Sequence, residues 1–488
     1  MTSPTHHTPP PPPPPPPADV DLGKLSYEIF SLLESKFLFG GGVGSVPGTP
    51  GRADLNGGGE GGKVRVLAID GCGPGPGDAL LAAAALARLE AALRSHAGDP
   101  SARVADFFDA AAGAGAGGVL AAMLFLKGDD GRARYSAADA LAFVAASLGK
   151  GGGGGWGPRR SSRWAAMLFG RARAERWSSA APSSTLRRVF GDATLRDTVA
   201  PLLVPCYDLA TAAPFLFSRA DAVESDSFDF RLRDVCAATC AGGGGGGAAA
   251  VRSVDGRTAI AAASGGVAAM GNPAAAAITH VLHNKQEFPL AAGVDDLLVV
   301  SIGSGSSAGA GGAAAAPSPG WRTPMPARSP SPAEMVRLTA EGVADMVDQA
   351  VAMAFGHTCG RNYVRIQAAC SGKTLSSLDA KKAVALADGM LTQRNVEAEL
   401  FRGRRLSEKS NREKLDAFAA ELVKEHDRRA RSPAGLPVVV IKQAAAAATP
   451  RPSSATTASS STTLATGRST ASTMPSPASQ DSSSSSCR

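Results

Sequence analysis

The chain has 488 residues, of which 44% are hydrophobic, 19% charged and 5% aromatic, and its formal net charge is +7. The hydrophobic content excludes a fully disordered chain, and the 57 glycines lack the period of three that collagen requires. Seven cysteines in this length are too few for a disulfide scaffold. A globular fold is therefore expected.

Both ends of the chain differ in composition from its centre. Residues 1–23 run through a series of prolines and predict a disordered tail. Apolar residues recur at helical spacing over 24–38, which predicts an amphipathic helix, and a glycine-rich linker follows as far as 62. Residues 444–488 are rich in Ser and Thr and predict a second disordered tail. One domain is expected between them, over 63–443.

Strand and helix patterns alternate within this domain. Buried strands are predicted at 64–69, 107–112, 202–209 and 296–303, and helices at 78–94 and from Val119. Such alternation is typical of a three-layer α/β fold, with a mainly parallel central sheet covered by helices. Low-complexity inserts at 149–158, 241–250 and 304–333 are expected to be loops of the same domain.

The last part of the domain is basic. An amphipathic helix is predicted to end before Pro433, and residues 437–441 (PVVVI) predict a final strand. Positive charge gathers between Arg402 and Arg431, which favours a solvated helix face and, as the alternative, peripheral contact with anionic membranes. Nucleic-acid binding is not expected, because no aromatic residues are interleaved with the basic ones and no zinc-finger spacing is present.

The sequence predicts no signal peptide and no transmembrane helix. Prolines occupy 9–17, where a signal would need an apolar stretch. The uncharged stretches 110–126 and 259–284 are interrupted by glycines, and the second also by a proline. We expect an intracellular protein, cytoplasmic or peripheral to a membrane, with reduced thiols.

Two glycine-rich turns each follow a predicted strand and precede a predicted helix, at 70–77 and 113–117. Turns of this kind gather backbone N–H groups at a helix N-terminus and favour an anion or a developing oxyanion. The first turn does not have the G-x-G-x-x-G spacing of a dinucleotide site, and no Gly-Lys-Ser/Thr follows to make a P-loop.

Three segments resemble the catalytic blocks of patatin-like lipid acyl hydrolases. They are AIDGCGPGPG (68–77), DFFDAAAGAGAGGVLAAML (106–124) and ASGGVAAMGNPAAAAITHVL (263–282). Residues 24–38, 205–222 and 347–356 are similar to the plant class III branch of that family. The resemblance implies hydrolysis of phospholipids or galactolipids, in plant lipid metabolism, growth or defence, with no cofactor and no metal.

The family uses a Ser–Asp dyad, and the resemblance locates both positions here. Gly115 stands at the nucleophile position, and the dyad Asp position is taken by Ser264, or by Gly265 in a register one residue later. The oxyanion loop would be formed by Cys72, Gly73 and Gly75, without the family's arginine. The class III branch is known for this glycine, and lipolytic activity has been attributed to its members.

Other side chains are weaker candidates for chemistry. Cys72 at a helix N-terminus is a candidate replacement nucleophile, but a structural role is favoured because no histidine partner can be placed. Asp255 is expected in a hairpin turn, and His280 and His283 are not expected to bind metal, since no third ligand is spaced for it. Three functions remain open: a lipid acyl hydrolase, a pseudoenzyme that binds lipid and acts through partners, or a plain interaction protein, which rests on the long tails and loops alone.

Overall fold

The computed structural model describes residues 62–71, 76–148, 184–241, 249–263, 265, 270–307, 329, 331–370, 379–399, 403–431 and 438–441. Both expected tails, the 24–38 helix and most of the low-complexity inserts lie outside the described residues.

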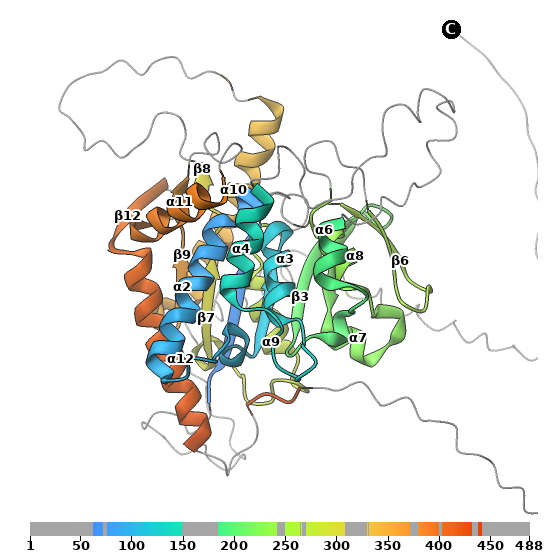
Figure 1. Ribbon diagram of the computed structural model, residues 1–488, viewed down its shortest axis with the longest axis horizontal. Helices are drawn as coiled ribbons and strands as arrows, with labels where there is room; N and C mark the ends of the chain where they lie inside the picture. Colours follow the sequence, from blue (N-terminus) through green and yellow to red (C-terminus); the bar gives the residue numbers. More distant parts are fainter. Residues whose placement is uncertain are drawn as a thin grey trace, which may run out of the picture. The chain divides into compact units, whose positions relative to one another are not determined.

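The core of the fold is a mixed, mostly parallel sheet of eight strands, as expected (Figure 1). Its order is β5-β6-β3-β2-β1-β7-β9, and β4 pairs with β3 off this path. The neighbouring strands β3, β2, β1, β7 and β9 are parallel to one another. Strands β4 and β6 pair with β3 in the antiparallel sense. The bounds are β1 (Val64–Ile69), β2 (Ala110–Gly113), β3 (Leu202–Asp208), β4 (Ala213–Ser218), β5 (Ala249–Arg252), β6 (Ala259–Ala263), β7 (Leu297–Ile302) and β9 (Tyr363–Ile366).

Helices cover both faces of the sheet. The described helices are α2 (Leu80–Ala97), α3 (Gly115–Phe125), α4 (Ala137–Leu148), α6 (Ser184–Phe190), α7 (Arg219–Glu224), α8 (Leu232–Thr239), α9 (Ala274–His283), α10 (Pro332–Phe355), α11 (Ala380–Thr392) and α12 (Asn411–Arg431). Two short strand pairs complete the described strands, β8 (Ser306–Ser307) with β10 (Ala369–Cys370) and β11 (Arg394–Glu399) with β12 (Gly403–Ser410).

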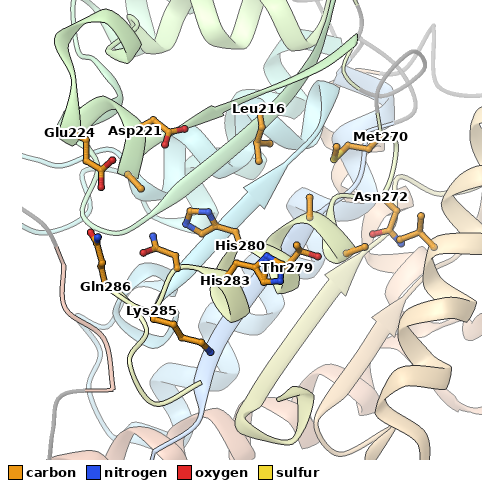
Figure 2. Close-up of a pocket in the computed structure, with 15 residues that line it drawn as sticks. Leu216, Asp221, Glu224, Met270, Asn272, Thr279, His280, His283, Lys285 and Gln286 are labelled. Atoms are coloured by element: carbon orange, nitrogen blue, oxygen red, sulfur yellow. The ribbon is translucent and has the colours of Figure 1, made fainter. Parts of the chain in front are cut away.

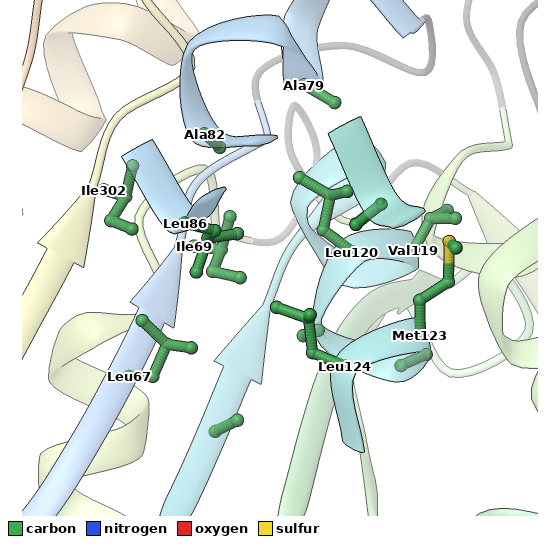
Figure 3. Close-up of a cluster of buried hydrophobic side chains, with 14 of the residues drawn as sticks. Leu67, Ile69, Ala79, Ala82, Leu86, Val119, Leu120, Met123, Leu124 and Ile302 are labelled. Atoms are coloured by element: carbon green, nitrogen blue, oxygen red, sulfur yellow. The ribbon is translucent and has the colours of Figure 1, made fainter. Parts of the chain in front are cut away.

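Strand β1 has apolar residues on both of its faces, and Arg65 is its one charged residue. Leu67 and Ile69 point into the larger core, which Figure 3 shows between β1, α2 and α3. Val64 and Val66 point into a second core formed with α9 and α10. A strand buried on both faces is a nearly continuous apolar run, so the mostly apolar sequence of 64–69 is explained by the three-layer arrangement.

Three sequence expectations need correction. Residues 438–441 form no strand; Val440 donates its N–H to the carbonyl of Glu287, so these apolar residues cover a loop rather than extend the sheet. Strand β2 starts only at Ala110, because Val104–Phe107 form a 3-10 helix. Part of the basic segment, Gly403–Ser410, is the strand β12 rather than a helix face.

Candidate active site

The turns that follow β1 and β2 are packed backbone against backbone. Ile69 is paired with Gly113, so the two parallel strands end level with each other. A Cβ atom at Gly71 would lie 1.8 Å from the carbonyl oxygen of Ala114, and one at Gly117 would lie 2.4 Å from that of Asp70. Neither position can carry a side chain without moving the backbone. The glycines at these two positions are therefore explained by close approach of the two turns.

Gly115 is the first residue of α3 and has a φ of +50°. This left-handed conformation is uncommon for residues other than glycine. Its buried N–H donates to the hydroxyl Oγ1 of Thr239, the last residue of α8, over 2.8 Å. A sharp turn from a strand into a helix is the geometry that presents a nucleophile in hydrolases with a G-x-S-x-G turn. Here the geometry is present without a hydroxyl.

The second candidate dyad segment reaches the same place from β6. Tyr207 pairs with Ala263, so the antiparallel β6 runs back along β3 and brings Gly265 beside Pro205. A Cβ atom at Gly265 would lie 2.1 Å from the carbonyl oxygen of Pro205 and 2.2 Å from Oγ1 of Thr239. Thr239 thus contacts both Gly115 and Gly265, and the structure brings these two predicted positions together.

The remaining predicted site residues, Cys72, Gly73, Gly75 and Ser264, lie outside the described residues. The described end of the first turn is nevertheless informative. The N–H of Gly71 donates to the carbonyl of Gly271 over 3.1 Å, so this N–H is not available to an oxyanion.

A buried ion pair lies at the base of the first turn, and sequence reasoning missed it. Arg365 on β9 donates to both carboxylate oxygens of Asp70, at 2.9 Å for Nη1 to Oδ1, and also to the hydroxyl of Ser301. Burial raises the pKa of Asp70 to about 6, although Arg365 opposes this shift. Beside it, the hydroxyl of Tyr363 donates to Asp348. The sequence signal for this ion pair was Arg365, which alternates with valine and isoleucine in the short strand YVRI.

Thr239 is the other functional candidate that sequence reasoning missed. It is fully buried at the end of α8 and lies far along the sequence from the turns that follow β1 and β2. No motif marks it, because its role follows from the tertiary packing of α8 against α3.

Several lesser expectations can also be checked. Asp255 lies in the β5–β6 turn and accepts hydrogen bonds from Ser253 and Arg257, as expected. Among the described residues no group of His, Cys, Asp and Glu is arranged to hold a metal ion. Within the same part of the chain, each helix is too short or too polar to cross a bilayer.

The sequence of this chain is similar to those of known proteins of one family. The model of the patatin-like phospholipase family matches residues 67–278. Patatin-like protein 3 of Oryza sativa subsp. indica is 53% identical over 83% of this chain and 92% of its own length. Patatin-like protein 7 of Arabidopsis thaliana is 44% identical over 87% and 85%. A third relative, 38% identical over 83% and 94%, is named probable inactive patatin-like protein 9 of Arabidopsis thaliana.

Proposed function

This chain belongs to the patatin-like phospholipase family, and on that premise we propose that it acts on the acyl esters of phospholipids or galactolipids as a slow hydrolase that forms no covalent acyl-enzyme. The observation that carries the proposal is the turn at Gly115. It keeps the strand-to-helix geometry and the positive φ of a nucleophile turn, yet it has no side chain to attack with. A role in plant lipid metabolism, growth or defence is part of the same proposal.

Two contributions to catalysis do not need the dyad. The N-terminus of α3 offers N–H groups and a positive dipole end where an oxyanion would develop. Positioning of the ester is the other contribution. In Ser–His–Asp proteases, what is left after the triad is removed is roughly 10³–10⁴-fold over water. A comparably small acceleration is expected here.

The alternative is a lipid-binding pseudoenzyme that acts through partners. It is favoured by Gly265, where the carbonyl of Pro205 and the hydroxyl of Thr239 leave no room for a carboxylate side chain. The name of the probable inactive relative points in the same direction. This alternative predicts lipid binding with no measurable release of fatty acid.

Slow release of fatty acid by the unmodified protein, against none, distinguishes the two functions, and restoring the dyad tests the proposed positions. The double variant Gly115→Ser, Ser264→Asp should release fatty acid from phospholipid or galactolipid vesicles faster than the unmodified protein. The matched control is Gly115→Ser with Gly265→Asp, which should not, because a Cβ atom at 265 overlaps backbone. A fluorophosphonate should label residue 115 only in the serine variants. Fast turnover by the unmodified protein, with an acyl group on Cys72 or Ser264, would contradict the proposal.

Contact with anionic membranes is also proposed, through the basic segment. Its arginines are partly engaged: Arg404 is paired with Asp345 at 2.7 Å, and Arg405 with Glu397 at 3.0 Å. Binding to anionic vesicles should weaken with salt, since the Debye length is ~8 Å at 0.15 M. Replacement of Arg402, Arg404 and Arg405 by Gln should reduce it, and salt-independent binding that survives the substitutions would exclude the segment.

A further inference from the structure

Helix α10 carries a row of apolar residues on the side that faces away from the protein. Five of its large apolar side chains are between 45% and 66% exposed, namely Met335, Val336, Val343, Met346 and Met353. At 3.6 residues per turn these positions fall on one face of the helix, and we call them the α10 stripe. Thr339, Gly342 and Ala350, which are also exposed, complete this face. From Met335 to Met353 the stripe is about 27 Å long, at 1.5 Å per residue.

The charged residues of α10 whose side chains are described lie on the other side of the helix. Asp345 pairs with Arg404 of β12 at 2.7 Å. Glu341 pairs with the same Arg404 at 3.6 Å and, one turn earlier on α10, with Arg337 at 3.0 Å. Asp348 accepts a hydrogen bond from a tyrosine hydroxyl of β9. Helix α10 is therefore amphipathic, but it is the uncharged face that is open to solvent.

The α10 stripe adjoins the candidate active site through the pocket shown in Figure 2. This pocket, of about 870 Å³, is lined in part by Met270, Asn272 and Val347, the last of which is on α10. Met270 donates its backbone N–H to the carbonyl of Gly265 over 2.7 Å, so the pocket adjoins the candidate site. Val347 is four residues after Val343, and residues four apart are neighbours on a helix surface. The stripe therefore borders the wall of the pocket.

An exposed apolar stripe of this length marks a contact with a protein or with a membrane. Protein interfaces have a polar rim and about one hydrogen bond per 100–200 Å². Of the residues on this face only Thr339 has a polar side chain, and its hydroxyl already donates to the carbonyl of Met335 over 3.0 Å. A face without charge or free hydrogen-bonding groups matches hydrocarbon, and interfacial amphipathic helices bury such a face about 5–10 Å deep. The family to which the chain belongs acts on lipids, so a lipid surface is the occupant that this face fits.

We propose that the α10 stripe docks this protein on the surface of a lipid bilayer, with α10 lying in the interface and its five apolar side chains at the edge of the hydrocarbon. The inference rests on the proposed function for the identity of the partner, but it requires neither hydrolysis nor a basic residue. It is distinct from the contact proposed for the basic segment, because Arg404 of that segment is paired with carboxylates of α10. Docking through the stripe brings the bilayer to the pocket beside Gly265.

The test measures co-sedimentation of the purified full-length chain with vesicles of a dialkyl-ether phosphatidylcholine in 1 M NaCl. An ether lipid has no acyl ester to hydrolyse, and the Debye length at this salt concentration is about 3 Å, which suppresses contact through charge. The unmodified chain should bind. Val343→Glu with Met346→Glu should weaken binding at least tenfold, because it places two carboxylates on the stripe. The matched control, Val384→Glu with Ala420→Glu, adds the same charge at exposed positions of α11 and α12 and should leave binding unchanged.

A gain of binding and a second copy of the chain are tested separately. Thr339→Leu extends the apolar stripe at an exposed position and should strengthen vesicle binding severalfold. Light scattering after size-exclusion chromatography, without vesicles, shows whether copies of the chain cover the stripe instead. A dimer that the Val343→Glu, Met346→Glu variant dissociates would overturn the proposal. The same holds if the unmodified chain does not bind the ether vesicles, or if neither set of stripe substitutions alters its binding.

The outcome is independent of the other contacts proposed above. Fatty acid release is not measured, so failure of the proposed hydrolysis leaves this result unaffected. On anionic vesicles the part of binding that weakens with salt belongs to the basic segment, and the Val343→Glu, Met346→Glu variant should retain it.

Discussion

Replacing Asp109 with alanine should destabilise the fold by about 3–5 kcal/mol, because it leaves the buried Arg65 without a counter-charge and the half-buried Arg429 with Glu425 alone. Asp109 lies just before β2 and is 8% exposed. It accepts hydrogen bonds from the side chain of Arg65 on β1, at 3.0 and 3.2 Å, and from Arg429 on α12, at 2.8 and 2.9 Å. The backbone N–H of Arg65 is a further donor at 2.8 Å. One carboxylate thus ties the last described helix to the amino end of the sheet.

The magnitude follows from burial. The side chains of Arg65 and Arg429 are 7% and 19% exposed, so water can replace the lost carboxylate only in part. Breaking a buried pair from one side costs about 3–5 kcal/mol, whereas an exposed ion pair is worth about 0–1 kcal/mol. The control is Asp427→Ala, also on α12. Its pairing with Arg431 at 3.9 Å is between side chains that are 50% and 79% exposed.

The assay is urea unfolding followed by circular dichroism. The midpoint should fall for Asp109→Ala with little change in the slope m, since the same surface is exposed on unfolding. Asp427→Ala should shift the midpoint by no more than the equivalent of about 1 kcal/mol. A loss for Asp109→Ala as small as that of the control would refute the reasoning, because it would mean that the arginines find water or other partners.

Other consequences can be measured in the same way. Burial alone would raise the pKa of Asp109, but Arg65 and Arg429 outweigh it and hold the pKa below its ordinary value of 3.8. The free energy by which the unmodified chain is more stable than Asp109→Asn should therefore have its full value above pH 3.8. It should shrink as the pH falls through the lower pKa of the folded state. Gly71→Ala should prevent folding or shift the turns, because the added carbon overlaps Ala114. Gly98→Ala should cost only about 1–2 kcal/mol, since its φ of +67° is strained but the space is open. Thr239→Val should cost about 1–3 kcal/mol by leaving the buried N–H of Gly115 without an acceptor.

The central strands can be predicted from the sequence because both of their faces are buried. A short, mostly apolar run such as 64–69 or 297–302 is typical of a strand in the middle of a parallel sheet, and the predicted bounds of both agree with the structure to within a residue or two. The predicted start of α3, at Val119, is four residues late, because the glycines of Gly115–Gly118 suggest a turn. Those glycines open the helix, and Gly117 among them is required by the close approach of the first turn. Local propensity does not report such a tertiary requirement.

The end of the domain is harder to predict for the same reason. Residues 437–441 have the β-branched composition of a strand, but this composition reports a half-buried surface as much as pairing in a sheet. Val438 and Val439 pack against the second core without joining the sheet. Motif resemblance proposes Gly115 and, for the dyad Asp, Ser264 or Gly265, whereas no motif marks Thr239, which contacts Gly115, or Arg365, which pairs with Asp70. Only the folded arrangement brings those side chains into contact.

The two glycines at the candidate site differ in what keeps a side chain out. At Gly115 the obstacle is conformational, because a φ of +50° costs a residue with a Cβ atom roughly 1–2 kcal/mol. Such a strained conformation persists where the surrounding structure holds the turn rigid. At Gly265 the obstacle is steric, and it involves backbone that cannot rotate away. Of the two proposed dyad positions, 265 therefore has no room for a carboxylate side chain. In the described residues, the turn from β2 into α3 is held without either dyad side chain, so we expect that binding of a lipid ester at this turn, if the proposed assignment holds, does not depend on the dyad being restored.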